Sequence, residues 1–223
     1  TAGYWNAGTC EFMFTEGNYY FLEMNTRLQV EHPITEEVTR TDLAREMLYV
    51  ASGLDLSYAQ EDIVQKGHAI EFRLNAEDPL NGFAPAPGKI VKYAEASGPG
   101  IRIDSGVYPG FTIPPFYDSM MAKLIVWGEN RNYCIQRSKR ALWEMQIGGV
   151  RTNIPFHEVV LDHPKFVEGD YTTSFIPKYE IMDKVVEYYK LKKSQQGGAK
   201  RAAAMAAVEA VIAGAAQSGD RKS

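Results

Sequence analysis

Residues 67–128 contain short runs of strand-forming residues that are separated by closely spaced prolines and glycines, and this pattern most constrains the fold. Proline and glycine interrupt strands and form turns, so each run stays short. Four strands are predicted: Ala69–Leu74, Lys89–Tyr93, Gly100–Asp104 and Met121–Trp127. Strands and helices do not alternate regularly along the chain, and this irregular mixture favours an α+β domain.

Three helices are predicted outside this region. One runs from about Thr41, a candidate N-cap, to Ala51, with Gly53 beyond its end. The second, over residues 130–146, is amphipathic. The third, over residues 180–195, is basic, and an Ala-rich segment follows over residues 199–216. We expect this segment to be a solvated helix, with a partner-binding helix as the alternative.

Composition narrows the class of protein. The chain is 45% apolar and has a formal net charge of −4, which argues against a general nucleic-acid binder. No stretch reaches the roughly 18–20 apolar residues of a membrane span. Cys10 and Cys134 lie far apart and show no ligand spacing, so we expect reduced thiols and a cytoplasmic location, or the mitochondrial matrix in a eukaryote.

Residues 9–24 predict a β-hairpin with an unusual pair of carboxylates. The strands Thr9–Thr15 and Tyr19–Met24 flank a predicted three-residue loop, Glu16-Gly17-Asn18. This register places Glu11 directly opposite Glu23, where like charges repel. A four-residue loop would instead place Glu11 opposite Leu22.

A proton, an arginine or a divalent cation would offset this repulsion. Glu11, Glu23 and the nearby amide Asn25 form an oxygen ligand set suited to Mg²⁺ or Mn²⁺ that holds a phosphate. The alternative is two exposed glutamates on an edge strand.

The polar segment that follows carries candidate anion ligands. Arg27, Gln29 and Glu31 stand at alternate positions and would share one face of an extended segment. Arg27 offers a planar fork of donors for a carboxylate or carbonate, and Glu31 is a candidate general base. Backbone N–H groups around Val30 suit an oxyanion. A surface Arg–Glu pair is the alternative.

Arg73 is a second candidate, on the predicted strand Ala69–Leu74. Pairing with Glu71 or Glu77 explains it equally well. The residues alone therefore indicate a metal–phosphate site beside an anion site, which suggests phosphoryl transfer without naming the acceptor.

Several strings in this sequence closely resemble biotin carboxylase. They lie within residues 4–177, and the string over residues 23–36 is the most specific: Glu-Met-Asn-Thr-Arg-Leu-Gln-Val-Glu-His-Pro-Ile-Thr-Glu. The others are residues 6–12, residues 67–79 and residues 117–124. The resemblance implies an ATP-grasp enzyme that carboxylates carrier-bound biotin with bicarbonate and MgATP.

The resemblance also implies roles for individual residues. Glu11, Glu23 and Asn25 would bind two Mg²⁺ or Mn²⁺ ions on the ATP phosphates. Arg27, Gln29 and Val30 would hold bicarbonate. Glu31 would deprotonate bicarbonate, which gives carboxyphosphate, and Arg73 would contact bicarbonate and stabilise the enolate-like ureido oxygen of biotin.

The resemblance predicts three parts of the chain and their partners. Residues 1–40 would end an ATP-grasp domain with a β-hairpin and loop. Residues 41–180 would form the biotin carboxylase C-terminal domain, with an antiparallel sheet, packed helices and a homodimer surface, and residues 181–223 would be a basic, Ala-rich tail. The implied partners are a biotin carboxyl carrier protein and the carboxyltransferase of an acetyl-CoA, propionyl-CoA or pyruvate carboxylase.

The family's Gly-rich lid and phosphate-binding lysines have no counterpart in these residues, so we expect the isolated chain to be inactive. Two other functions stay open at this point. One is an oligomerisation or scaffold module of a carboxylase complex. The other is a different ATP-grasp ligase, such as carbamoyl-phosphate synthetase.

Overall fold

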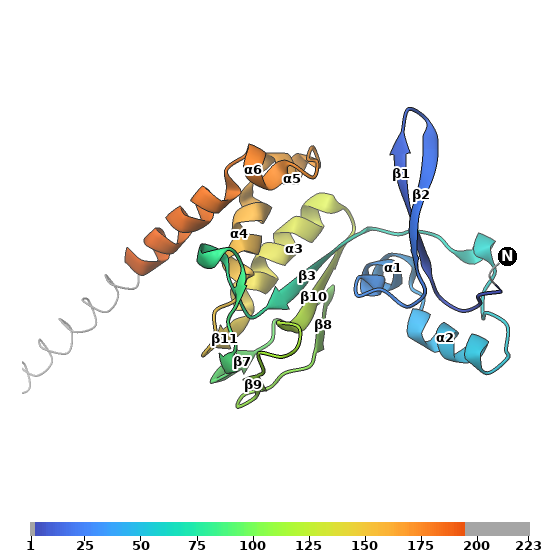
Figure 1. The fold of residues 1–223 in the computed structure, drawn as a ribbon, viewed down its shortest axis with the longest axis horizontal. Coiled ribbons are helices and arrows are strands. Elements are labelled where there is room, and N and C mark those ends of the chain that lie inside the picture. The colour runs from blue at the N-terminus through green and yellow to red at the C-terminus, as the bar shows by residue number, and fades with distance from the viewer. Residues whose placement is uncertain (1–2, 195–223) are drawn as a thin grey trace, which may run out of the picture. The chain divides into compact units, whose positions relative to one another are not determined.

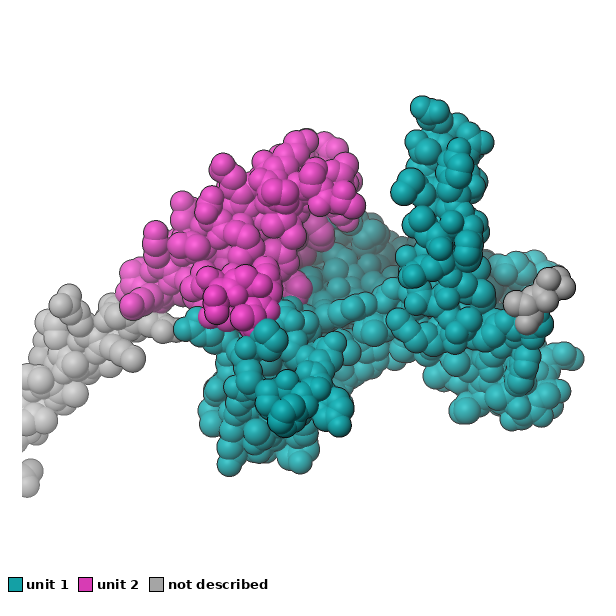
Figure 2. All heavy atoms as spheres, viewed as in Figure 1, with its two compact units in different colours: residues 1–77, 85–154 teal, residues 78–84, 155–223 magenta. Residues whose placement is uncertain are grey.

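A computed structural model describes residues 3–194 (Figure 1). The chain divides into two compact units, one of residues 1–77 and 85–154, the other of residues 78–84 and 155–223 (Figure 2). The first unit mixes helices with short strands, and its hairpin and central sheet are antiparallel, while the second unit is mainly helical. The predicted α+β class is confirmed.

The first unit opens with the hairpin of β1 (Thr9–Thr15) and β2 (Asn18–Asn25). Its turn has two residues, Glu16 and Gly17, both with positive φ (50° and 81°), so the predicted three-residue loop is wrong. Such a turn matches the twist of antiparallel strands. An irregularity between Glu11 and Phe12 then shifts the register by one residue, and Glu11 pairs with Glu23 as predicted.

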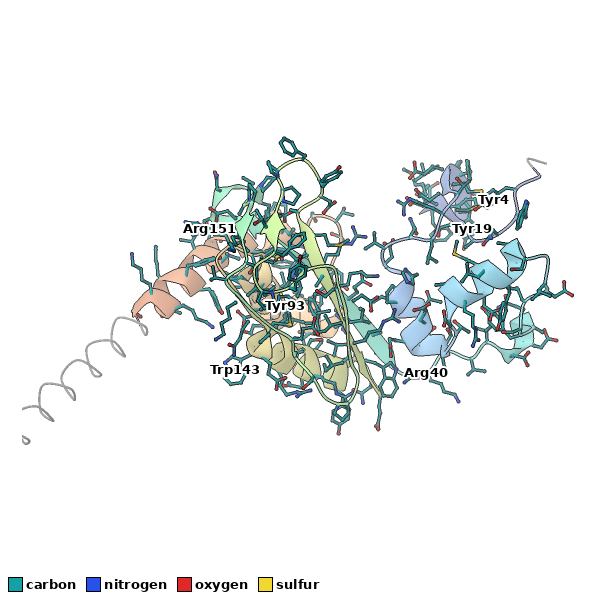
Figure 3. The ribbon with its side chains drawn as sticks, turned by 90° about the horizontal axis from the view of Figure 1, so that it is seen from below. Tyr4, Tyr19, Arg40, Tyr93, Trp143 and Arg151 are labelled. Atoms are coloured by element: carbon teal, nitrogen blue, oxygen red, sulfur yellow. The ribbon has the colours of Figure 1, made fainter. Side chains whose placement is uncertain are left out.

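Both faces of this hairpin expose large apolar side chains. Tyr19, which is labelled in Figure 3, is 72% exposed. The aromatic side chains of the two strands contact one another across the hairpin. A two-stranded hairpin alone is marginally stable in water, and contiguous apolar surface of this kind marks an interaction site. The hairpin therefore has the composition of strands that are covered on both faces.

Two helices follow the hairpin. Helix α1 (His32–Thr39) has Pro33 in its first turn, a position that proline tolerates because its missing N–H has no intrahelical acceptor there. This helix was not among those predicted from the sequence. Helix α2 (Leu43–Ala51) confirms the predicted helix, but its N-cap is Asp42, which accepts from the Arg45 N–H at 2.9 Å, and not Thr41.

The centre of the first unit is a three-stranded antiparallel sheet in the order β3-β10-β8. Its strands are β3 (His68–Asn75), β10 (Met120–Gly128) and β8 (Ile101–Ser105). Helix α3 (Arg131–Glu144) packs against β3 and β10 through its buried residues, and the N-cap Asn130 accepts from the Tyr133 N–H at 3.0 Å. The strands and the amphipathic helix predicted here are confirmed.

The two faces of this sheet differ in polarity. The register puts buried apolar side chains on one face: Phe72, Leu74, Leu124 and Val126. On the other face it places a row of charged side chains: Glu71, Arg73, Arg102, Asp104 and Lys123. Because α1 contacts β3 and β10, this charged face supports the segment that joins the hairpin to α1.

Short strands complete the first unit around a second core of Ala76, Ile90, Ile113 and Met121. They are β4 (Glu77–Asp78), β5 (Ala84–Pro85), β6 (Gly88–Lys89), β7 (Lys92–Ala94), β9 (Thr112–Ile113) and β11 (Gln146–Gly148). The predicted strand Lys89–Tyr93 is wrong as one element. It is broken into β6 and β7, and Ile90 between them is fully buried.

The second unit is helical. It contains α4 (Ile154–Asp162), α5 (Pro164–Glu168), α6 (Phe175–Lys178) and helical residues 181–194, and short 3₁₀ turns occupy Gln60–Asp62 in the first unit and Pro79–Asn81 in the second. Leu161, Ile181 and Val185 are fully buried. The predicted Ala-rich helix lies outside the described residues. Within residues 3–194, every helix is too short or too polar to cross a bilayer.

Candidate functional site

The hairpin carboxylates converge on one amide group. The Asn25 Nδ2 atom donates to Glu11 Oε1 at 3.0 Å and to Glu23 Oε1 at 3.3 Å. This shared donor offsets part of the repulsion between the two carboxylates, which are exposed to solvent. The bridging amide was not among the compensations that the sequence suggested.

The same cluster has the donor chemistry of a divalent-cation site. Two carboxylates and an amide supply oxygen ligands once the Asn25 amide turns its oxygen inward, and Mg²⁺ usually takes few protein ligands and completes its shell with phosphate oxygens and water. Within residues 3–194, no group of three or more His, Cys, Asp or Glu forms a metal site. Glu11, Glu23 and Asn25 supply too few ligands to surround a cation alone, and they fit a cation whose other ligands are the oxygens of a bound phosphate.

The polar loop after β2 brings three other predicted residues to one pocket. An open pocket of about 350 Å³ is lined by Arg27, Gln29 and Glu31, together with Gly8 and Thr9 beside β1. The predicted extended segment is wrong, because the loop bends at Arg27 and turns over residues 30–31. The three residues therefore reach one pocket without sharing the face of an extended segment. The Arg27 Nη1 atom donates to the Leu28 carbonyl at 3.3 Å, and the rest of the guanidinium fork can serve an anion.

Glu31 and Arg73 meet across 42 positions of sequence. Arg73 Nη2 donates to Glu31 Oε2 at 2.8 Å, and both side chains are 51% exposed. The sequence offered Glu71 and Glu77 as partners of Arg73, and the structure adds Glu31, which the sequence did not suggest. An exposed ion pair contributes little stability, so the pair is better placed for binding than for holding the fold together.

Two polar residues that were not selected from the sequence bind the backbone beside this pair. Asn153 is buried and covers the free edge of β3, where its Nδ2 donates to the Arg73 carbonyl and its Oδ1 accepts from the Asn75 N–H, both at 2.9 Å. Lys123 donates to the Val30 carbonyl at 3.2 Å. A lysine in the middle of the apolar run of residues 121–127 was the one signal in the sequence.

Glu71 lies on the charged face of the sheet next to Arg73. Burial raises the pKa of its carboxyl group to about 7, and Lys123 and Arg73 only partly offset this effect, while Glu31 and Asp104 add to it. Its Oε2 atom is buried and has no hydrogen-bond partner among residues 3–194. Glu71 therefore carries a proton under mildly acidic conditions.

This carboxyl group predicts a pH dependence of stability. The folded state binds the Glu71 proton more tightly than the unfolded state does, so the cost of ionising Glu71 is absent below pH 4.5, grows up to about pH 7 and is constant above it. Glu71→Gln removes this cost. With allowance for the partial exposure of Glu71, the variant should gain about 1–2 kcal/mol in the free energy of unfolding over wild type between pH 5 and pH 8.

Urea unfolding followed by tryptophan fluorescence at the two pH values measures this gain. Glu61→Gln, at an exposed position, is the control and should follow wild type at both. If the Glu71→Gln and wild-type stabilities change in parallel with pH, the account of Glu71 is wrong.

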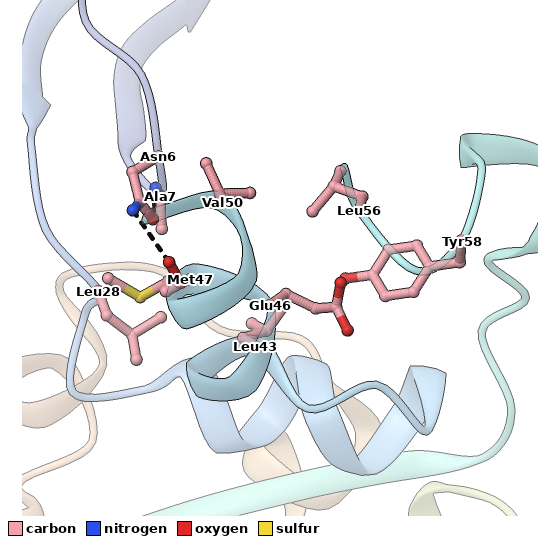
Figure 4. A pocket seen from close by; sticks show the side chains of 9 residues that line it. All are labelled: Asn6, Ala7, Leu28, Leu43, Glu46, Met47, Val50, Leu56 and Tyr58. Carbon is pink, nitrogen blue, oxygen red and sulfur yellow. Dashed lines mark hydrogen bonds between the residues drawn. The ribbon is translucent and has the colours of Figure 1, made fainter. Parts of the chain in front are cut away.

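A second pocket of about 340 Å³ lies beside α2 (Figure 4). It is lined mostly by apolar side chains, among them Leu28, Met47 and Leu56, and Asn6 Nδ2 closes one side by donating to the Met47 carbonyl at 3.2 Å. Its one carboxylate, Glu46, is satisfied by the Ser57 N–H (2.9 Å) and hydroxyl (2.6 Å). Glu46 therefore anchors the loop after α2.

Two segments of the chain match two different protein families. Residues 71–178 match the biotin carboxylase C-terminal domain, and residues 1–59 match the carbamoyl-phosphate synthase L chain, ATP binding domain. Residues 71–178 are therefore similar to the C-terminal domain of biotin carboxylase, and residues 1–59 are similar to an ATP-binding domain. The resemblance seen in the sequence is confirmed.

Individual relatives agree with these matches. The chain is 56% identical over 177 residues to a pyruvate carboxylase component from Methanothermobacter thermautotrophicus and 53% identical over 182 residues to biotin carboxylase 1 of Bacillus subtilis. These alignments cover 79% and 81% of this chain but 36% and 40% of the relatives, so the chain spans about two fifths of their length.

Solved structures give the same result. The biotin carboxylase domain of a thermophilic 2-oxoglutarate carboxylase, bound to bicarbonate, superposes with a TM-score of 0.77 at 43% identity, over 81% of this chain and 41% of that one. The corresponding domain dimer from Hydrogenobacter thermophilus, with MgADP, ADP and bicarbonate, also has a TM-score of 0.77, at 44% identity, and covers 81% of this chain and 40% of its own.

Proposed function

We propose that this chain is the C-terminal part of an enzyme that carboxylates carrier-bound biotin with bicarbonate and MgATP through a carboxyphosphate intermediate. The Glu31–Arg73 contact of 2.8 Å carries this proposal. It joins a residue of the ATP-binding match to a residue of the biotin carboxylase match, so neither segment alone holds the site. A carbamoyl-phosphate synthase would not require the second segment.

The hairpin carboxylates serve the nucleotide in this proposal. Glu11 and Glu23, with Asn25, hold Mg²⁺ or Mn²⁺ ions against the ATP phosphates. A divalent cation supplies charge neutralisation and orientation at the γ-phosphate when it is bound. The convergence of both carboxylates on one Asn25 nitrogen, at 3.0 and 3.3 Å, supports this role because the three groups reach a common point.

The residues of the loop after β2 bind and deprotonate bicarbonate in this proposal. Arg27 and Gln29 line the pocket and bind the anion through N–H donors, with backbone groups at Val30. Glu31 accepts the proton of bicarbonate, and the resulting carbonate oxygen attacks the γ-phosphorus to give carboxyphosphate and ADP. Glu31 also lines this pocket, which supports its role as the base.

Arg73 serves the second step. In this role it leaves Glu31 to contact bicarbonate and then stabilises the negative charge that develops on the ureido oxygen of biotin. A planar guanidinium suits both anions, since each presents oxygen atoms to its fork of donors. The exposure of Arg73, 51%, supports this role because the carrier-bound biotin must reach it from outside.

The reaction implies partners. A biotin carboxyl carrier protein brings the biotin, and the carboxyltransferase of an acyl-CoA or pyruvate carboxylase takes the carboxyl group onward. We also propose a homodimer through residues 41–180 in the cytoplasm, and the dimeric relative from Hydrogenobacter thermophilus supports the association.

The 223 residues alone should not cleave ATP. The apolar hairpin is exposed on both faces, and the sequence contains no counterpart of the Gly-rich lid and phosphate-binding lysines expected of the family.

The test of the proposed carboxylation is the transfer of labelled carbon from bicarbonate to free biotin by the full-length enzyme that contains this chain. We expect label in carboxybiotin only when MgATP is present. Label in carbamoyl phosphate, with ammonia as the acceptor, would contradict the proposal.

A further inference from the structure

Lys123 is a nearly buried charged residue to which neither the sequence pattern nor the proposed reaction gives a role. It lies in the middle of β10 on the charged face of the sheet, and its side chain is 13% exposed. Burying an ammonium group is costly unless hydrogen bonds and opposite charges compensate. Its partners therefore indicate what Lys123 is for.

Lys123 Nζ has two partners on different elements. It donates to the Val30 carbonyl at 3.2 Å and lies 3.3 Å from Asp104 Oδ2 on β8. Asp104 alone would be harder to ionise when buried, but the bonds and charges of Arg102 and Lys123 outweigh that effect and lower its pKa. The Lys123 ammonium group thus forms an ion pair with the Asp104 carboxylate on one side and donates a hydrogen bond to the Val30 carbonyl on the other.

The contact with Val30 fixes one peptide plane of the bicarbonate loop. In a trans peptide the C=O and the following N–H point in opposite directions, so a Val30 carbonyl that faces Lys123 turns the Glu31 N–H away from the sheet. A hydrogen bond to a charged donor also polarises the peptide and strengthens that N–H as a donor.

The neighbouring carbonyl of the loop is also held. His32 Nδ1 lies 2.7 Å from the Gln29 carbonyl. Behind the loop, Arg102 joins Asp104 (2.8 Å) to Glu36 on α1 (2.6 Å), so the ion pairs that begin at Lys123 return to the helix that the loop enters. The sheet thus holds the loop and the helix at linked points.

We propose that Lys123 is a positioning residue that sets the backbone of the bicarbonate loop at Val30 and Glu31. The inference rests on the proposed function, because it assigns the loop to bicarbonate. Lys123 does not touch the substrate in this account. It acts through the Val30 peptide, and its effect should therefore be specific to bicarbonate.

The test uses Lys123→Met in the full-length enzyme, because methionine keeps the length and the apolar stem and removes the charge. We expect the KM for bicarbonate in ATP cleavage to rise about 10- to 100-fold, the effect of a hydrogen bond to a charged group, with the KM for ATP within about twofold of wild type. The matched control is Lys165→Met, which removes an exposed lysine paired with Glu168 and Asp170 in the second unit and should change neither constant. An unchanged bicarbonate KM in Lys123→Met overturns the proposal.

Amide hydrogen exchange separates this claim from the proposed function. We expect exchange over residues 26–31 to become at least about tenfold faster in Lys123→Met but not in Lys165→Met, while exchange over α3 stays the same in both. If wild type shows no bicarbonate-dependent ATP cleavage, the proposed function fails, and the positioning role is decided by exchange alone. Equal exchange over residues 26–31 in wild type and Lys123→Met overturns it. If Lys123→Met does not fold, Lys123→Gln is judged by the same criteria.

Discussion

Replacement of Glu31 by glutamine in the full-length enzyme should reduce kcat for bicarbonate-dependent ATP cleavage by about 10²- to 10⁴-fold, the contribution typical of a general base. Glutamine keeps the size of the side chain and an oxygen that can accept from Arg73, which donates to Glu31 at 2.8 Å in the structure. It cannot take the proton of bicarbonate. The KM for ATP should therefore stay near its wild-type value.

Glu37→Gln provides the matched control for this experiment. Glu37 lies six residues further along, on α1, and also pairs with an arginine, Arg40, at 3.2 Å. The control should leave kcat within about twofold of wild type because Glu37 is not among the residues that line the pocket with Glu31. If Glu31→Gln keeps the wild-type kcat, Glu31 is not the base.

Replacement of either hairpin carboxylate should raise the Mg²⁺ concentration needed for half-maximal ATP cleavage by at least about 10- to 100-fold. Glu11→Gln and Glu23→Gln each remove one charged ligand from the cluster around Asn25. Stability should not fall in parallel, because each change also removes one of two facing like charges, worth a few tenths of a kcal/mol or more. Activity titrated with Mg²⁺ and thermal unfolding without it measure the two effects.

The control for this experiment is Glu16→Gln in the turn of the same hairpin. It makes the same change of charge at an exposed position away from the cluster, so the Mg²⁺ requirement should be unchanged. A rise of equal size in the control would show that the hairpin acts through its net charge. The specific metal role of Glu11 and Glu23 would then be wrong.

Local pattern predicted the hairpin, the main strands and three of the helices of the described chain, those over residues 43–51, 131–144 and 181–194. It succeeded where alternation and turn residues act over a few positions. The predicted pairing of Glu11 with Glu23 is correct, but the predicted three-residue loop is wrong. A two-residue turn together with a register shift between Glu11 and Phe12 gives the same pairing. Pro33 in the first turn of α1 was a helix signal that the sequence analysis missed because the residues around it are polar.

Long-range contacts account for what the sequence could not show. Arg73 reaches Glu31 across 42 positions, Lys123 reaches Val30 across 93, and Asn153 reaches Arg73 across 80. No periodicity connects residues at such separations, because the register of three strands and the packing of α1 on the sheet bring them together. Only the resemblance to biotin carboxylase gave Arg73 a role before the structure placed it beside Glu31.

In the proposed function, Glu31 and Arg73 form one site for bicarbonate and biotin. The most direct test measures ATP cleavage by the full-length enzyme with and without bicarbonate and free biotin, beside the same enzyme with Arg73→Ala and beside the 223-residue chain. We predict cleavage by the wild-type enzyme that needs bicarbonate and is stimulated by biotin, loss of that dependence in Arg73→Ala, and no cleavage by the 223-residue chain. A wild-type rate of ATP cleavage that is the same with and without bicarbonate and biotin would contradict a shared site for these two substrates.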